Sequence, residues 1–318
     1  MSQIKVEILK QGLETGNVLS TSFFRMSNGY RDFSKYEHNL KQFLEKTKVL
    51  PDFEVRIYTD NSASDVCLRI ANDYQTVTVL KYECEFFKEN SGHTGTFGTI
   101  VRFLPLFEKN LNTVWISDID IDSTFLNRSL LTHMKHHKCD IFIDSAICYE
   151  RKPQSNVKYP IVAHRFISFV QFPKQLFTRF MTKLIDGDMK DMIDELNEFN
   201  SRKTPNEKFP YGMDEVFLNY SLYSYIQRHS YRILNRKSYF AESYVLYKGT
   251  KVTETEKDTL IRFYKTKTQK DLTAVKKIYK KYVPELLATY PCLQELLDVL
   301  DDLHKEFELY RTFNSSEL

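Results

Sequence analysis

The chain has 318 residues and a mass of 37.8 kDa, which is enough for one large domain or two ordinary ones with a sizeable core. Its composition, 42% hydrophobic and 27% charged, excludes a collagen, a coiled-coil rod and a disordered acidic tail. The 45 basic and 42 acidic residues leave a net charge of +3. This small charge gives no indication of nucleic-acid binding, so we expect no nucleic-acid partner.

The sequence lacks the usual marks of membrane insertion or secretion. No apolar run approaches the roughly 18 residues that a membrane span needs, and the first residues carry charges where a signal peptide would be apolar. The cysteines are odd in number and form no C-x-x-C motif. We therefore expect a reduced, cytoplasmic protein without a transmembrane segment.

Hydrophobic periodicity up to about residue 150 predicts strands that alternate with helices. Ser34 and Glu37 form a capping box that would open the first helix. The alternation of apolar and polar residues over 53–58 predicts a strand with one exposed face. A further helix is expected from about Thr96 to Phe107. The other strands are expected at 18–24, 76–81, 113–116 and 141–143.

The second half begins as mixed α/β and continues as helices. A helix is expected to start at Pro173, and another, marked by Val216, Tyr220 and Tyr223, after Asp214. Strands are expected at 166–170 and near residues 233 and 245, and helices from 253 to 313. We therefore predict an α/β catalytic domain over residues 1–250 and a C-terminal helical extension, residues 251–318, packed on it.

Strands separated by helices of ten or more residues imply crossover connections. The fold class we expect is α/β, with a mainly parallel central sheet flanked by helices. Ligands of such sheets bind beyond the carboxyl ends of the strands. The residues to consider first are therefore Phe23 and Arg25 after the first strand, Asp60 after the second, and the segment after Ile116.

Alternating aspartates directly follow the apolar strand that ends at Ile116. If the strand continued, Asp118 and Asp120 would project to the same face. Two carboxylates held this close repel each other, and a hard divalent cation such as Mn²⁺ or Mg²⁺ would resolve the repulsion. The alternative is that they merely end the strand, and for Asp122 a helix cap is the preferred interpretation.

Three segments in this order resemble nucleotide-sugar-dependent glycosyltransferases of the GT-A, Rossmann-like fold, including members from large DNA viruses and bacteria. The string 114–120 resembles their strand plus D-x-D motif. Residues 98–106 resemble the helix that the family places before this strand, and residues 211–219 its acidic helix start on the acceptor side. A late His-x-x-Gly, which supplies a third metal ligand in one branch of the family, does not occur here.

The resemblance implies a transfer of a hexose or pentose from a UDP- or GDP-linked donor to a glycan or glycoprotein, in the cytoplasm, or in the host cytoplasm if the chain is viral. Asp118 and Asp120 would bind the metal, and Asp214 or Glu215 would contribute catalytically. The nucleotide-sugar would contact Phe23, Arg25, Asp60, Arg102, Ser117 and Asp118. For Arg102, a contact with Asp118, an ion pair with Glu108 and exposure to solvent all stay open.

Two alternatives come from other classes of protein. Asp120 and Asp122 match the D-x-D-x-T motif of haloacid-dehalogenase-type phosphatases, in which the first aspartate is the nucleophile. That motif normally follows the first strand of its domain, whereas more than a hundred residues precede it here. The other alternative is a non-catalytic α/β module whose C-terminal helices bind a partner.

Overall fold

The computed structural model describes residues 4–26, 32–120, 138–145, 161–201 and 206–235, with short pieces at 131, 134–135 and between 253 and 281. The chain divides into two compact units, one of residues 1–121 and 140–233 and one of residues 122–139 and 234–318. The domain boundary predicted near residue 250, the strand near 245, Asp122 and most of the helices predicted after residue 253 lie outside the described residues.

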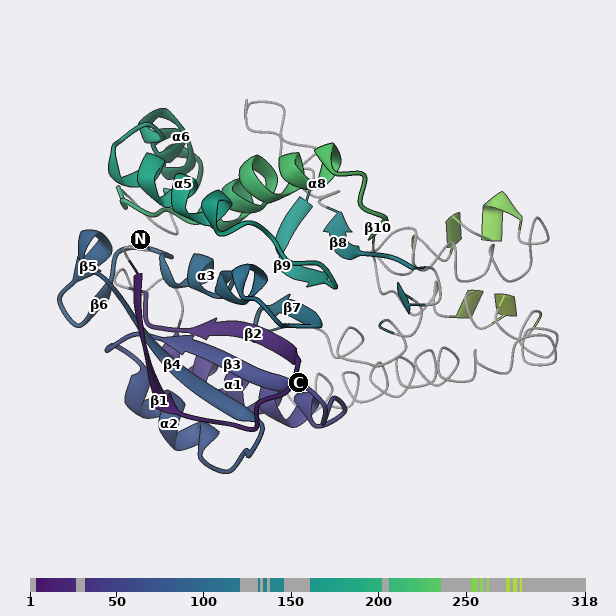
Figure 1. Cartoon of the computed structure of the whole chain (residues 1–318), viewed down its shortest axis with the longest axis horizontal. Coiled ribbons are helices and arrows are strands. Elements are labelled where there is room, and N and C mark those ends of the chain that lie inside the picture. The colour runs from purple at the N-terminus through teal and green to yellow at the C-terminus, as the bar shows by residue number, and fades with distance from the viewer. Residues whose placement is uncertain are drawn as a thin grey trace. The chain divides into compact units, whose positions relative to one another are not determined.

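The centre of the fold is an eight-stranded sheet in the order β1-β4-β3-β2-β7-β9-β8-β10 (Figure 1). Strands β4, β3, β2 and β7 run parallel to one another. Strand β1 pairs antiparallel with β4, and β9 pairs antiparallel with both β7 and β8. The α/β fold with parallel central strands is confirmed. The strand bounds are β1 Ile4–Lys10, β2 Asn17–Phe23, β3 Glu54–Thr59, β4 Val77–Cys84, β7 Thr113–Ser117, β8 Ile141–Ser145, β9 Ile161–Ser168 and β10 Ile233–Asn235.

Strand β3 is buried along almost its whole length, so the prediction of one exposed face is wrong. Glu54 is 1% exposed, lies 3.0 Å from the Arg56 guanidinium and accepts a hydrogen bond from the Thr78 hydroxyl at 2.6 Å. Arg56 also pairs with Glu108 at 2.6 Å. Because these charged side chains are partners of one another, they can alternate with apolar residues inside the protein.

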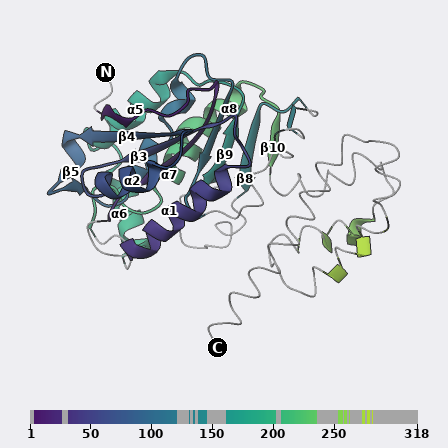
Figure 2. The ribbon, with the colours of Figure 1, turned by 90° about the horizontal axis from the view of Figure 1, so that it is seen from below.

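Helices cover both faces of the sheet (Figures 1 and 2). One face carries α1 (Phe33–Thr47) and α2 (Ser64–Ala71). Helix α1 buries Leu40, Phe43 and Leu44, as its periodicity predicts. Its cap is Asp32, whose side chain accepts a hydrogen bond from the Ser34 N–H at 2.9 Å. The predicted capping box is therefore wrong, because Ser34 already lies inside the helix.

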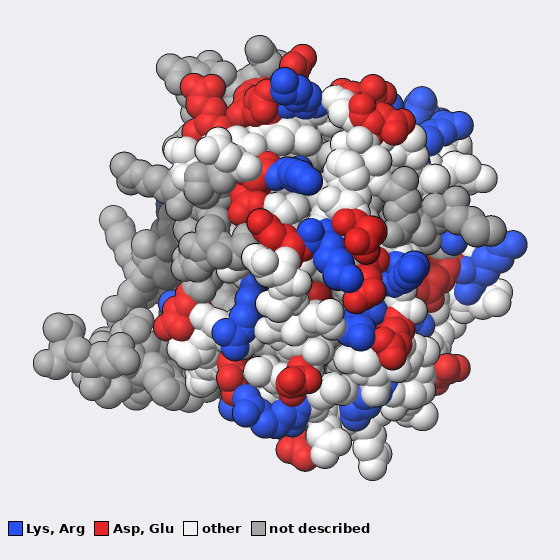
Figure 3. Space-filling model, turned by 90° about the vertical axis from the view of Figure 1, so that its left-hand side faces the viewer, with Lys and Arg blue, Asp and Glu red and all other residues white. Residues whose placement is uncertain are grey.

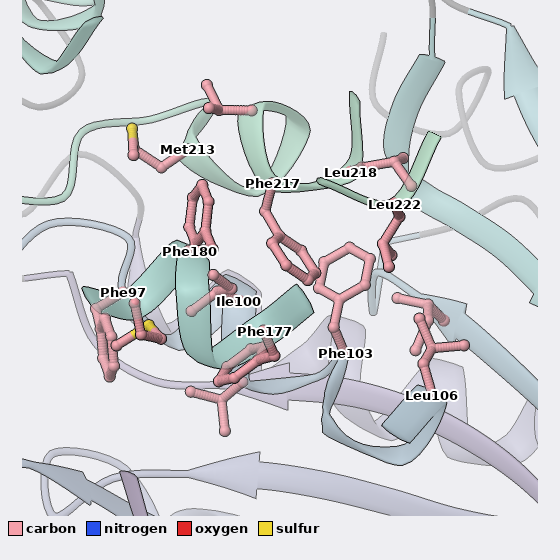
Figure 4. Packing of buried hydrophobic residues seen from close by; sticks show 14 of the residues in the cluster. Phe97, Ile100, Phe103, Leu106, Phe177, Phe180, Met213, Phe217, Leu218 and Leu222 are labelled. Carbon is pink, nitrogen blue, oxygen red and sulfur yellow. The ribbon is translucent and has the colours of Figure 1, made fainter. Parts of the chain in front are cut away.

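The opposite face carries a larger aromatic cluster (Figure 4). Phe103 and Phe217 pack edge to face with ring centroids 5.4 Å apart, and Phe180 lies 5.0 Å from Phe217. Such edge-to-face pairs stabilise a core beyond the area that they bury. The elements on this side are α3 (Gly98–Val101), η2 (Leu104–Phe107), α5 (Lys174–Ile185), α6 (Lys190–Phe199), α7 (Met213–Val216) and α8 (Ser224–Arg228).

Two helices of this layer depart from the predicted periodicity. The helix expected to reach Phe107 stops at Val101, and a 3₁₀ turn with Pro105 near its start follows, because proline cannot donate the next helical hydrogen bond. After α7 the chain forms a π-helical stretch, η4 (Phe217–Tyr223), which changes the buried face. Tyr220, one of the residues that mark this helix in the sequence, is 51% exposed.

Acidic and basic side chains are interspersed over the face shown in Figure 3. This distribution accords with the small net charge. In the part of the chain that the structure describes, no helix is both long enough and apolar enough to cross a membrane.

Candidate functional site

The carboxyl ends of the parallel strands bring together segments that are far apart in the sequence. Phe23 at the end of β2 lies level with Thr59 at the end of β3, and Ser20 lies level with Ile116 of β7. The residues that follow these strands therefore lie along one edge of the sheet. This is the edge at which α/β proteins bind their ligands.

Arg102, directly after α3, connects two carboxylates at this edge. Its Nη1 donates to Asp118 and to the Ser117 carbonyl at 3.4 Å, and its Nη2 donates to Asp214 at 2.7 Å. The arginine side chain is only 3% exposed. Of the alternatives left open for Arg102, the structure shows the contact with Asp118. The arginine is not exposed to solvent, and Glu108 pairs with Arg56 instead.

The backbone of Arg102 is anchored as well as its side chain. The buried Ser20 hydroxyl of β2 donates to the Arg102 carbonyl at 2.7 Å. This bond ties the end of α3 to the central strand. Because both ends of the residue are held, the guanidinium has a fixed position between Asp118 and Asp214.

Asp118 and Asp120 follow β7 rather than belonging to it, since the strand ends at Ser117. Strand alternation therefore does not set the directions of their carboxylates, contrary to the sequence argument. The Asp118 side chain is 37% exposed and Asp120 is exposed. Among the described residues, no group of three or more His, Cys, Asp and Glu side chains has the arrangement of a metal site.

Asp214 and Glu215 lie in the first turn of α7. The helix follows Gly212, whose φ of +98° is a conformation that glycine adopts without strain. Both acidic residues are 7% exposed. Burial raises the pKa of Glu215 well above its usual value, the nearby Asp214 raises it further, and Arg102 acts in the opposite direction. Glu215 therefore keeps its proton at pH values where an exposed glutamate is ionised.

Asp60 is the centre of a second cluster at the same edge. Its carboxylate is fully buried and accepts hydrogen bonds from the Ser62 N–H at 3.0 Å, from the Ser62 hydroxyl and from His93 Nδ1 at 3.2 Å. His93 Nε2 accepts from the Cys84 N–H at 3.1 Å, so the ring proton must be on Nδ1. Asp60 thus joins the end of β3 to that of β4.

The remaining predicted nucleotide contacts differ in accessibility. Phe23 and Ser117 are fully buried, and Phe23 packs on Phe33 with ring centroids 5.3 Å apart. Arg25 is exposed, and its guanidinium lies 3.7 Å from the centre of the Phe33 ring. The Arg25 N–H also donates to Ser62 at 3.0 Å. Of the predicted site residues, Arg25, Asp118 and Asp120 therefore have accessible polar side chains, whereas Arg102, which contacts Asp118, is buried.

Sequence reasoning missed Ser20, Ser62 and His93. The Asx-turn pattern of 60–62 was a signal for Ser62, because aspartate side chains commonly accept from the N–H two residues on. His93 had no local signal: its partner Asp60 is 33 positions away, and the contact depends on the tertiary fold.

Comparison with known proteins gives little further information. No protein-family model matches the chain, and no curated protein matches its sequence. Among the solved structures that match, 4-diphosphocytidyl-2C-methyl-D-erythritol synthase from Anaerococcus prevotii resembles the chain at 8% sequence identity and a TM-score of 0.35. The match covers 69% of this chain and 87% of that one.

Proposed function

We propose that the chain is a metal-dependent glycosyltransferase. It would move a hexose or pentose from a nucleotide-sugar, with a UDP-linked donor favoured and a GDP-linked one possible, to a hydroxyl of a glycan or glycoprotein. The observation that supports this proposal best is the position of Arg102 between Asp118 and Asp214. These three residues come from the three segments that resemble GT-A transferases, and they meet at the ligand-binding edge of a parallel sheet.

The acidic residues after β7 have suitable donor atoms for Mn²⁺ or Mg²⁺. Asp118 Oδ1 accepts a hydrogen bond from Arg102. Because the Asp118 side chain is partly exposed, its other oxygen can face a cation. Asp120 would be the second carboxylate ligand, and the diphosphate and water would complete the coordination. When bound, the cation would stabilise the charge that develops on the departing nucleoside diphosphate.

The chain's own residues have separable roles in this proposal. Arg102 holds the side chains of Asp118 and Asp214 in fixed positions, because it donates a hydrogen bond to each of them. Arg25, exposed beside the end of β2, is placed to contact the base or phosphates of the donor. Asp214 or Glu215 would act on the acceptor hydroxyl, and the raised pKa of Glu215 suits a group that accepts or gives up a proton.

Phe23, Asp60 and Ser117 keep a supporting role in the proposal, because their side chains are buried. Asp60 and His93 fix the turn after β3, and Ser62 in that turn holds the backbone of Arg25. Binding of the donor next to this turn would then depend on Asp60 without direct contact with its carboxylate.

The experiment is a panel of UDP- and GDP-sugars with and without Mn²⁺, scored by donor hydrolysis and by the melting temperature. We expect one nucleoside diphosphate and Mn²⁺ together to stabilise the chain by about 2–4 kcal/mol at saturating concentrations. Asp118→Asn should abolish both the hydrolysis and the joint stabilisation. Asp188→Asn, a substitution of an exposed aspartate in the turn before α6, is the matched control and should change neither.

Two results would contradict the proposal. One is the absence of any joint effect of metal and nucleotide across the whole panel. The other is rapid hydrolysis of p-nitrophenyl phosphate that is lost on Asp120→Asn, which would favour a phosphatase with Asp120 as its nucleophile.

A further inference from the structure

Strand β1 forms one end of the central sheet. One side of it pairs with β4, and no strand in the described ranges pairs with its other side. An edge strand presents a row of N–H and C=O groups that a further strand can pair with. Proteins usually protect such an edge with charged or proline residues, or with a very short strand.

One face of β1 carries exposed apolar side chains. Val6 and Ile8 are 42% and 57% exposed, and alternation places them on the same face as the buried Ile4. Lys5 and Glu7 project from the other face and are also exposed. A strand of this composition, with two opposite charges on one face and branched apolar residues on the other, is suited to pair with another strand.

The regular part of β1 is short and has a defined centre. Pairing with β4 is continuous from Ile4 to Ile8, and the register shifts between Ile8 and Lys10. The Lys10 ammonium turns inward and donates to the carbonyls of Tyr74 and Val77, both at 2.8 Å. The regular stretch of β1 is therefore Ile4–Ile8, and its central residue is Val6.

We propose that β1 pairs antiparallel with β1 of a second copy of this chain, about a two-fold axis at Val6. In this register Lys5 lies opposite the partner's Glu7, and Glu7 lies opposite the partner's Lys5. Val6 meets the partner's Val6. The eight-stranded sheet then continues across the interface, as in isologous dimers.

Charge complementarity selects this register over its neighbours. A shift of the axis to Glu7 would place two carboxylates directly opposite each other, which is destabilising in an antiparallel pair. A shift by one residue of either strand would also bring apolar side chains opposite charged ones. Glu7 binds Lys81 of β4 at 2.9 Å, but its side chain is 63% exposed and can accept from a second ammonium group.

The proposal is independent of the enzymatic function. Five residues of edge strand bury less surface than the roughly 1,200 Å² of a standard interface, so we expect a dissociation constant in the micromolar range. Sedimentation equilibrium of the full chain from about 1 to about 100 µM covers this range. We expect the wild-type chain to form a dimer within it.

Charge reversal tests the register. Lys5→Glu places like charges opposite each other at both pairs of the interface, and so does Glu7→Lys. Each variant alone should be a monomer at every concentration. In an equimolar mixture of the two variants, the carboxylates at positions 5 and 7 of one chain lie opposite the ammonium groups at positions 7 and 5 of the other. The mixture should therefore form a heterodimer. Circular dichroism and the melting temperature would verify that each variant is folded.

Lys174→Glu, an exposed substitution at the start of α5, is the matched control and should dimerise like the wild type. The proposal is overturned if the wild-type chain stays monomeric up to about 100 µM, which would leave the edge of β1 unpaired in solution. It is also overturned if the wild-type dimer survives both reversals, or if the mixture of the two folded variants stays monomeric.

Discussion

Arg102 Nη2 donates to Asp214 Oδ2 across 2.7 Å, although 112 positions separate the two residues. The two side chains are 3% and 9% exposed, so water screens their attraction little. The same guanidinium also contacts Asp118. One arginine therefore connects the end of α3, the end of β7 and the start of α7, and its removal affects all three.

Arg102→Met should be among the most damaging single substitutions in this chain. It leaves Asp214 buried without its cationic partner, and such broken pairs cost about 3–5 kcal/mol. Unfolding by urea would measure the loss. Arg69→Met is the control, because Arg69 pairs with Glu37 at 3.0 Å but is 66% exposed, and such pairs contribute less than about 1 kcal/mol. Equal losses in the two variants would contradict the argument.

Glu215→Gln should change how stability depends on pH. The pKa of Glu215 is raised in the folded state above its ordinary value of 4.5, so the folded chain keeps a proton that the unfolded chain releases. Its contribution to stability is complete below pH 4.5 and is lost as the pH rises toward the folded pKa. The Glu215→Gln variant has no such loss of stability, because glutamine carries no proton that it could release in this pH range.

The free energy of unfolding of Glu215→Gln relative to the wild type should therefore increase between pH 5 and 8, by at most about 1.4 kcal/mol per pH unit. Urea titrations at several pH values would show the trend. Glu85→Gln, at a side chain that is 93% exposed, provides the baseline. A difference for Glu215→Gln that stays constant with pH would show that the proton is released in both states.

The sequence predicted well what depends on local pattern. Apolar runs identified the central strands, and the resemblance to GT-A transferases gave a contact between Arg102 and Asp118 as one of the open alternatives. What it could not provide depends on tertiary contacts. The pair of Glu54 and Arg56 converts an alternating strand into a buried one, and the choice between Glu108 and Asp118 as the partner of Arg102 depends on where Arg56 lies.

Antiparallel strands and helix irregularities were also beyond the sequence argument. The charged alternation of β1 resembles that of an exposed loop until β4 is present to pair with it. The π-helical stretch after α7 moves Tyr220 to the surface, although the spacing of Val216, Tyr220 and Tyr223 fits an ordinary helix. Local periodicity carries no information about such an insertion.

His93→Ala should destabilise the fold although the residue is outside the proposed reaction. The substitution removes a donor to the buried Asp60 and an acceptor for the Cys84 N–H, and unpaired buried groups cost about 1–3 kcal/mol each. The ring also stacks on Phe97 with centroids 5.4 Å apart. Thermal unfolding would measure the loss of stability. The control is His38→Ala, at an exposed position of α1. A small, equal shift for both variants would argue against the Asp60 network.

Gly98→Ala should be destabilising because α3 begins in close contact with β2. A Cβ at this position would lie 2.3 Å from the Phe24 ring and 2.5 Å from the Tyr82 hydroxyl. Overpacking of this kind costs about 1–3 kcal/mol. Phe24→Leu should recover part of the loss when combined with Gly98→Ala, since the smaller side chain leaves room for the added methyl group. If the double variant is less stable than the sum of the two single losses, the contact with Phe24 is not the cause.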